Sequence, residues 1–365
     1  MPIYMDRHDL TEEVTAEHVA QIHQEDLRIE HKYGCKGLTY WFDGERRAAF
    51  CLIDAPNKEK LKEMHDQAHG AIPTSIIEVD PTLVESFLGR IDDPKSDEDT
   101  DLNLLIDHPF RYIMVTKISN NSLPSLSDID FFLYFNENML KRVIHFNGSL
   151  VKKKMDGLLI SFKSISDAIS CAVEIQKELI QFKKDNKLPT LKLKIGLSAG
   201  IPVSDGDEIF ADTIKLAERL CNDVIGQIVL SSEVKDLYVS ENANNNFNRE
   251  MIRSLKPFNE IFLISFLDFM EKSWTKTDLK VEDFSKNLGF SKSQLYRKIK
   301  YITGKSLNTF IKEYRLEKAV ELLKKQKGNI SEIAFETGFN SPAYFSKCFH
   351  RTYGILPSSY IKQAS

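Results

Sequence analysis

The sequence is poor in the residues that mark several common classes of protein. Only five of its 365 residues are cysteine, an odd number spread along the chain. This usage excludes a disulfide framework and fits reduced thiols in the cytoplasm. No apolar run approaches the roughly 18 residues that a membrane helix needs, so no membrane association is expected. The start of the chain has no basic segment followed by an apolar one, and no secretory signal is expected.

The composition is that of a globular protein, but its charge is unevenly distributed. Hydrophobic residues make up 42% and charged residues 28% of the chain, whose length suits two or three domains. Residues 1–110 carry 11 Lys and Arg against 24 Asp and Glu, a net charge of −13. Residues 261–365 carry 18 against 10, a net charge of +8. A basic end behind an acidic front indicates that only the C-terminal end binds a polyanion.

The hydrophobic patterns predict a multidomain α+β protein. Residues 1–90 follow the order βαββαβ of a ferredoxin-like unit. Residues 91–108 are acidic and nearly free of apolar side chains at their start, which predicts a linker. Residues 109–258 show a mixed α/β pattern, and residues 261–365 an all-helical one. The elements expected in the first unit are Pro2–Met5, Ala16–Tyr33 behind an N-cap at Thr15, Gly37–Phe42, Arg47–Ile53, Lys58–His69 and Ser75–Val79.

Two segments near the C-terminal end share one layout. Each has a short amphipathic helix, a Gly-Phe turn at Gly289 or Gly338, and a second helix that opens on small polar residues. A helix expected at Leu307–Lys325 separates them and spans roughly 28 Å at ~1.5 Å per residue. This length is close to the ~34 Å repeat of DNA, so both second helices can reach one face of a duplex. The pattern predicts a double helix-turn-helix.

Residues Phe262–Ile361 closely resemble the AraC/XylS family of transcription regulators. The stretches that carry the resemblance are SQLYRKIKYITGKS, FIKEYRLEKAVELL, ISEIAFETGFNSPAYFSKCFHRTYG and LPSSY. The resemblance implies sequence-specific binding of double-stranded DNA, whereas a helical bundle without a DNA role is the alternative.

Polar positions early in each second helix are the candidates for DNA contact. We expect Arg297 to pair with guanine and Gln294 with adenine. For any single polar residue, a solvated surface position is an equally good interpretation. The candidate base-contacting residues are Lys292, Ser293, Gln294, Arg297, Asn340, Ser341, Tyr344 and Lys347; phosphate contacts are expected from Lys298, Lys300, Lys305 and Arg351, and core positions at Tyr296, Ile299, Phe345 and Phe349.

The middle segment resembles the catalytic domain of class III nucleotide cyclases. The resemblance rests on GSLVKKKMDGLLISF from Gly148, LKIGLSAG from Leu193, FADTIKLAERL from Phe210 and GQIVLS from Gly226. It implies two aspartates that hold divalent cations on a triphosphate.

The catalytic residues that this resemblance implies are incomplete. Asp156 matches the second metal ligand, but Lys117 stands where the first is expected. Lys215 replaces the transition-state asparagine, while Arg219 and the base-selecting Lys152 are retained. The segment is therefore predicted not to be an enzyme, and to dimerise with or without a vestigial nucleotide site at Lys152, Asp156 and Arg219. The alternative is an active cyclase with an attached DNA-binding domain.

The N-terminal segment resembles small bacterial ferredoxin-fold proteins, some described as nickel-binding. The matching stretches are MPIYMDRHDL, KYGCKGLTYWFD, AAFCLIDAP and HDQAHGAIPTSIIEVDP. Independently, His65 and His69 are four apart on an expected helix, with Cys51 on the preceding strand and His8 just after the first strand. Histidine and cysteine donors suit Ni²⁺, Zn²⁺ or Cu²⁺. Alternatively, Cys51 is a small core residue and the domain binds a small molecule or only dimerises; His18, His23 and His31 are expected on the surface.

The sequence as a whole predicts a cytoplasmic, homodimeric transcription regulator. Its front domain senses an effector, which is nickel, zinc or a small molecule, and its end binds DNA. A metal-buffering protein with incidental DNA affinity is the remaining alternative.

Overall fold

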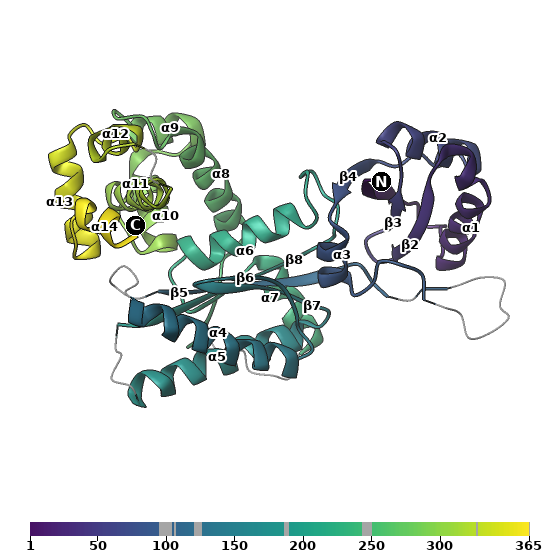
Figure 1. Cartoon of the computed structure of the whole chain (residues 1–365), viewed down its shortest axis with the longest axis horizontal. Helices are drawn as coiled ribbons and strands as arrows, with labels where there is room; N and C mark the ends of the chain where they lie inside the picture. The colour runs from purple at the N-terminus through teal and green to yellow at the C-terminus, as the bar shows by residue number, and fades with distance from the viewer. Residues whose placement is uncertain are drawn as a thin grey trace.

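Three bodies follow one another along the chain (Figure 1). The computed structural model describes residues 1–94, 104–105, 107–119, 126–185, 190–242, 250–325 and 328–364. Figure 1 shows a small α/β domain at the N-terminal end, a middle domain built on a larger sheet, and a helical domain at the C-terminal end. Within the described residues, no helix is both long and apolar enough to cross a membrane.

The N-terminal domain has the predicted βαββαβ order. Its four-stranded antiparallel sheet has the strand order β2-β3-β1-β4. Thr15 caps α1 as expected, because its side chain accepts a hydrogen bond from the His18 amide. The first strand is longer than predicted, so that His8 lies on β1, opposite Ala49, instead of after the strand. The elements are β1 (Ile3–Asp9), α1 (Ala16–Tyr33), β2 (Lys36–Asp43), β3 (Ala48–Asp54), α2 (Lys58–Ala68) and β4 (Ser75–Val79).

The middle domain repeats the same connectivity in a six-stranded sheet of order β10-β9-β8-β5-β7-β6. Helices α4, α5 and α7 pack on one face of this sheet, and α6 packs on the other. Strands β9 and β10 extend the sheet in parallel beyond β8. The elements are β5 (Arg111–Ser119), α4 (Leu126–His145), β6 (Ser149–Lys154), β7 (Gly157–Phe162), α5 (Ile165–Asp185), β8 (Lys192–Gly200), α6 (Ala211–Asp223), β9 (Ile228–Leu230), α7 (Ser232–Glu241) and β10 (Ile252–Ser254).

Helix α6 lies unusually close to β8 because two glycines of that strand face it. A Cβ atom on Gly196 would meet the Ala217 carbonyl oxygen at 2.1 Å, and one on Gly200 would meet the Thr213 hydroxyl at 2.1 Å. Such distances are far inside van der Waals contact, so only glycine permits this approach. The position of α6 on the sheet is therefore fixed by its close contact with the backbone of β8.

The C-terminal domain is all-helical, as predicted, and contains two hydrophobic cores. The first core lies among α8, α9, α10 and the start of α11, and the second among the end of α11, α12, α13 and α14. Gly289 and Gly338 have positive φ angles of 71° and 79° in the turns between paired helices. The helices are α8 (Pro257–Ser273), α9 (Val281–Leu288), α10 (Lys292–Thr303), α11 (Leu307–Lys324), α12 (Ile330–Glu336), α13 (Pro342–Tyr353) and α14 (Pro357–Ala364).

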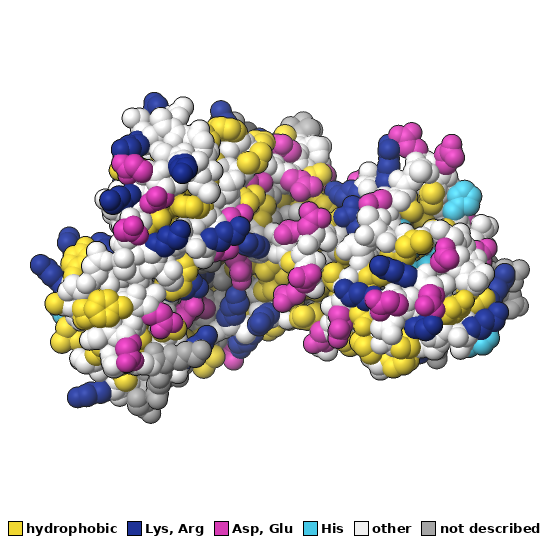
Figure 2. Space-filling model, turned by 90° about the horizontal axis from the view of Figure 1, so that it is seen from above, with side chains coloured by type: hydrophobic (Ala, Val, Ile, Leu, Met, Phe, Trp, Pro, Cys, Tyr) yellow, Lys and Arg dark blue, Asp and Glu magenta, His cyan; other side chains and the backbone are white. Residues whose placement is uncertain are grey.

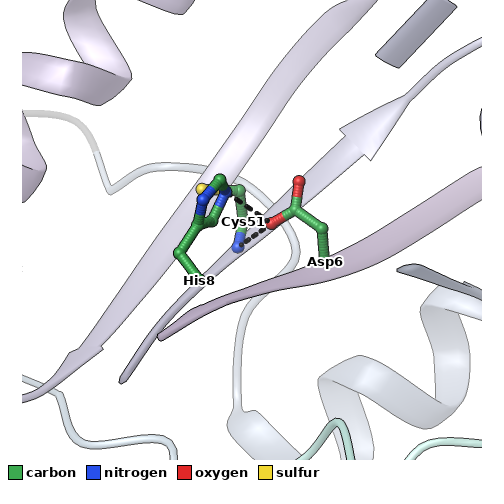
Figure 3. Close-up of side chains that lie close together, drawn as sticks. All are labelled: Asp6, His8 and Cys51. Atoms are coloured by element: carbon green, nitrogen blue, oxygen red, sulfur yellow. Dashed lines mark hydrogen bonds and ion pairs between the residues drawn. The ribbon is translucent and has the colours of Figure 1, made fainter. Parts of the chain in front are cut away.

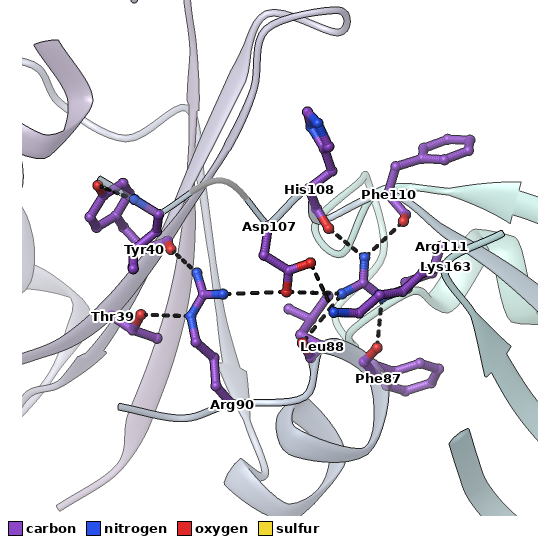
Figure 4. A network of polar contacts seen from close by, with 11 residues as sticks. Thr39, Tyr40, Phe87, Leu88, Arg90, Asp107, His108, Phe110, Arg111 and Lys163 are labelled. Atoms are coloured by element: carbon purple, nitrogen blue, oxygen red, sulfur yellow. Dashed lines mark hydrogen bonds and ion pairs between the residues drawn. The ribbon is translucent and has the colours of Figure 1, made fainter. Parts of the chain in front are cut away.

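A helix that was not predicted, α3 (Pro81–Leu88), connects the first two domains. The Phe87 ring lies 4.8 Å from the Phe210 ring, between centroids, and joins a core shared by both domains. The buried Arg111 guanidinium on β5 donates to the carbonyl oxygens of Phe87 at 2.8 Å and Leu88 at 3.2 Å (Figure 4).

The described parts of the predicted linker are packed against these domains. The Asp93 amide donates to the Leu38 carbonyl oxygen at 2.9 Å, and the Leu105 amide donates to the Tyr40 hydroxyl at 3.2 Å. Asp107 forms ion pairs with Arg90, Arg111 and Lys163 (Figure 4). Residues 95–103 and 106 lie outside the described residues.

Candidate metal centre and nucleic-acid interface

His65 lies at the centre of a buried polar cluster in the N-terminal domain. It projects from α2 towards the sheet and is fully buried. Its Nε2 is 2.8 Å from Asp6 Oδ2 on β1, and its Nδ1 is 3.1 Å from Asp26 Oδ1 on α1. His69, the residue after the end of α2, completes this group with its Nε2 at 3.1 Å from His65 Nδ1 and 3.2 Å from Asp26 Oδ1.

A second group adjoins the first through Asp6. Figure 3 shows His8, on the same strand, and Cys51 on β3 side by side, with dashed lines that join each of them to the Asp6 carboxylate. Asp6 Oδ1 accepts a hydrogen bond from the Cys51 amide at 3.0 Å and lies 3.4 Å from His8 Nε2. Asp6, His8 and Cys51 form one set of three candidate metal ligands, and Asp26, His65 and His69 form another; within each set the ligand atoms lie within 4.8 Å of one another.

The charges of this cluster are coupled. Burial would lower the pKa of His65, but the charge of Asp6 and hydrogen bonds with Asp26 and Asp6 outweigh it and raise this pKa to about 10. Burial would raise the pKa of Asp6, yet the charges of His8 and His65 and their hydrogen bonds lower it overall. Burial, assisted by the charges of Asp6 and Asp26, raises the pKa of the Cys51 thiol well above its usual value. Without a cation, His65 is thus an imidazolium between two carboxylates, and Cys51 is a thiol.

The donor set fits a borderline divalent cation. Imidazole, carboxylate and thiolate donors are those that nickel and zinc accept, and ligation requires loss of protons from His65 and Cys51. Within the cluster, His8 Nε2 and Asp26 Oδ2 are two buried atoms without a hydrogen-bond partner, one in each set of ligands. A cation bound in either set would give that set's atom a partner.

Two of the six residues in this cluster, Asp6 and Asp26, were missed by sequence reasoning. Asp6 is two residues before His8 and therefore points to the same face of the strand. Asp26 lies on the face of α1 that also buries His23. The expectation that His23 is at the surface is wrong: its ring is 4% exposed and its Nε2 is 3.1 Å from Asp93 Oδ2.

The second helix of each helix-turn-helix begins at a serine cap. Ser291 Oγ accepts from the Gln294 amide, while Gln294 Oε1 accepts from the Ser291 amide at 2.9 Å. Ser341 Oγ likewise accepts from the Tyr344 amide at 3.4 Å. The side chains of Gln294 and Ser341 therefore form capping hydrogen bonds at the starts of α10 and α13. Gln294 Oε1 can accept a hydrogen bond from a base only if it gives up its capping bond with the Ser291 amide.

Most of the other candidate DNA-contacting side chains are exposed. On the face drawn in Figure 2, Lys and Arg side chains lie among Asp and Glu side chains, so net charge alone does not define a DNA-binding surface. The surface is better defined by the helices α10 and α13, which expose Lys292, Ser293, Arg297, Tyr344, Lys347 and Arg351, and by Asn340 just before α13.

Tyr296 of α10 differs from expectation, and Lys298 has a contact that was not predicted. Tyr296 was predicted to face the core but is 43% exposed. Lys298 was predicted to contact phosphate, but its Nζ lies 4.0 Å from the centroid of the Phe258 ring and donates to Asn259 Oδ1 at 3.1 Å. Burial against α8 lowers the pKa of Lys298. Tyr296 therefore joins the exposed face of the first recognition helix, and Lys298 is directed to α8.

The candidate nucleotide-binding residues of the middle domain lie on three segments. Lys152 is exposed on β6, and Asp156 lies in the turn between β6 and β7. Arg219 on α6 is buried and forms ion pairs with Asp268 and Glu271 of α8. Within the described part of the chain, no hydrogen bond or ion pair joins Lys152, Asp156 and Arg219 to one another.

Two segments of the chain match models of known protein families. Residues 284–363 match the model of a helix-turn-helix domain family. The C-terminal domain is an AraC-type helix-turn-helix domain. Residues 4–79 match the family model described as nickel responsive protein SCO4226-like, so the N-terminal domain is an SCO4226-like domain.

Individual relatives cover only parts of the chain. Histidine kinase P4 of Formosa agariphila is 38% identical over 107 residues, which are 29% of this chain and 8% of that protein. The transcriptional regulator MtrA of Neisseria gonorrhoeae is 38% identical over 73 residues, 20% of this chain and 24% of that protein. An adenylate/guanylate cyclase/hydrolase structure from Silicibacter pomeroyi is similar to the middle domain, with 24% identity, a TM-score of 0.33, and coverage of 38% of this chain and 84% of that one. The chain thus spans less than a third of these two curated relatives.

Proposed function

We propose that this protein is a transcription regulator that binds a specific double-stranded DNA sequence through α10 and α13. The observation that carries the proposal is the pair of capped recognition helices, each preceded by a positive-φ glycine turn and each exposing basic and polar side chains near its start. Such helices insert into successive major grooves, where arginine and polar side chains contact base edges.

The test is selection of a binding site from random duplexes by the full chain. The isolated residues 261–365 are unsuitable, because their first core includes Leu220, Val224 and Val229 of the middle domain. On the selected duplex, Arg297→Ala should cost about 1–3 kcal/mol and relax one base position. Arg28→Ala, at an exposed position of α1, is the matched control and should leave affinity unchanged. Selection of no common sequence would refute the proposal.

We propose that the effector is a divalent transition metal, nickel or zinc, held by the buried cluster around His65. The two adjoining sets of three ligands and the unpartnered Asp26 Oδ2 support this. Calorimetry of the metal-free chain with Ni²⁺ and Zn²⁺ tests it. Asp26→Asn combined with His69→Ala should weaken binding at least tenfold, whereas His18→Ala with His31→Ala, on the exposed face of α1, should not. Equal affinities in both double variants would place the metal elsewhere.

We propose further that the middle domain is not a cyclase and that the protein is a homodimer. The substitution of Lys117 for a metal ligand and the ion pairs of Arg219 support the first point. Formation of cyclic nucleotide from ATP or GTP with Mn²⁺, abolished by Asp156→Ala, would contradict it. Sedimentation of the full chain tests the second point, and a monomer at micromolar concentration would contradict it.

A further inference from the structure

Helix α6 contributes buried residues to two hydrophobic cores, one shared with the N-terminal domain and one shared with the C-terminal domain. Ala217 and Cys221 are fully buried in the core that also contains residues of the N-terminal sheet and of α3. Leu220 and Val224, at the end of the helix and just beyond it, are fully buried in the core of the first helix-turn-helix. One helix therefore has buried residues in cores that include side chains of both neighbouring domains, and Phe210, the residue before it, contacts Phe87 of α3.

Polar contacts fix the side of α6 that faces α8. Arg219 Nη2 is 2.5 Å from Asp268 Oδ1 and 3.1 Å from Glu271 Oε1, and its Nη1 donates to the Ile264 carbonyl oxygen at 3.4 Å. Lys215 Nζ lies 3.1 Å from the same Asp268 oxygen and 3.4 Å from Glu271 Oε2. Burial would raise the pKa of Asp268, but the hydrogen bonds from Arg219 and Lys215 lower it. Two cations of α6 thus meet two carboxylates of α8.

The chain after α6 is tied to the first recognition helix itself. The Ile225 amide donates to the Ile302 carbonyl oxygen at 2.9 Å, and Arg253 of β10 donates to the Tyr301 carbonyl oxygen at 2.7 Å. Both acceptors lie in the last turn of α10. The second helix-turn-helix has a separate core that contains only residues of α11–α14 and the turns between them. Movement of α6 would therefore be transmitted to the first motif and not directly to the second.

We propose that α6 couples the N-terminal domain to the first helix-turn-helix, with Arg219 and Lys215 as the residues that position α8. This deepens the proposed function, on which it rests for metal as the input and DNA as the output. Because α6 packs directly against the backbone at Gly196 and Gly200, the helix moves with the sheet as one unit. Such a connected element allows an effector that shifts the N-terminal core to change DNA affinity.

The experiment compares Arg219→Gln with Glu218→Gln in the full chain. Glu218 is the adjacent residue of α6, but its partner is Lys154 of β6 at the surface, so it is a matched control. Backbone hydrogen exchange is the first measurement. Loss of the charged hydrogen bonds of Arg219 should speed exchange in α8 and in the last turn of α10 about tenfold or more, without a change in α13. Glu218→Gln should change none of these segments.

The second measurement is affinity for the selected duplex with and without Ni²⁺. In Arg219→Gln the ratio of the two affinities should fall towards one, while nickel affinity stays within about threefold of wild type. The charge-exchanged pair Arg219→Asp with Asp268→Arg should recover at least part of the ratio. An unchanged ratio in Arg219→Gln, or equal acceleration of exchange in α8 and α13, would overturn the proposal. If nickel has no effect on the wild-type affinity, the metal input of the proposed function is wrong, and the exchange result alone decides the role of α6.

Discussion

Asp107 provides a sharp test of how the N-terminal and middle domains are joined. Its carboxylate lies 2.9 Å from Lys163 Nζ, 3.3 Å from Arg90 Nη1 and 3.6 Å from Arg111 Nη2. The Lys163 pair is exposed and contributes less than about 1 kcal/mol. Arg111 is 1% exposed, and its burial lowers its pKa to about 10, an effect that Asp107 opposes. Asp107→Asn removes the negative charge that stabilises the buried Arg111 guanidinium, but it leaves the carbonyl oxygens that accept hydrogen bonds from Arg111. The free energy of unfolding should therefore fall by about 2–4 kcal/mol.

Urea unfolding of the full chain measures this effect. Trp41 lies beneath the Arg90 guanidinium at 4.6 Å, so its fluorescence reports on this junction once Trp274→Phe removes the other indole. Asp92→Asn, at an exposed position of the same segment, is the control and should stay within about 0.5 kcal/mol of the parent. If the free energy of unfolding of Asp107→Asn is also within about 0.5 kcal/mol of the parent, the junction does not depend on this carboxylate.

Two further predictions concern stability. Gly289 and Gly338 both have positive φ, which costs alanine about 1–2 kcal/mol, but only at Gly338 would a Cβ atom meet other atoms, with the Trp274 carbonyl oxygen at 2.8 Å. Gly338→Ala should therefore lower the melting temperature more than Gly289→Ala, and equal shifts would contradict this account. Burial, assisted by Glu317, raises the pKa of Asp223 to about 6, so its ionised form is disfavoured in the folded state. Asp223→Asn should stabilise the chain by about 1–2 kcal/mol at pH 8, and this gain should vanish as the pH falls from 6 to 4, where the wild-type carboxyl is protonated in the folded state. Urea midpoints that differ by the same amount at both pH values would refute the assignment.

The sequence predicted the elements whose signals are local. Thr15 caps α1, and Gly289 and Gly338 mark the two turns, features that are visible without any tertiary information. Helix α3 was missed because it is short and its apolar face packs against another domain. Strand β10 has only three residues and is recognised by its pairing with β9. In both cases the evidence for the element lies in its partner.

The difference between local signals and tertiary contacts also explains which residues of the candidate sites were predicted. Helical period predicted core positions for Ile299, Phe345 and Phe349, and the structure buries all three. It does not determine whether a residue beside these buried positions packs on a neighbouring helix, and for this reason the exposure of Tyr296 and the contact of Lys298 with the Phe258 ring were not predicted. The histidines of the metal cluster were visible as a spaced pair. The carboxylates that hold His65 were not, because they come from β1 and α1 and meet it only in the folded sheet.

The ion pairs of Arg219 connect the middle domain to the C-terminal domain. A buried guanidinium without an anionic partner is strongly destabilising, typically by 3–5 kcal/mol, and the resemblance to cyclases assigns this residue to a nucleotide. In this chain Asp268 and Glu271 of α8 form ion pairs with Arg219. A nucleotide that bound Arg219 would compete with these carboxylates and weaken the contact between α6 and α8. The ion pairs with α8 are therefore sufficient to account for a buried guanidinium at this position.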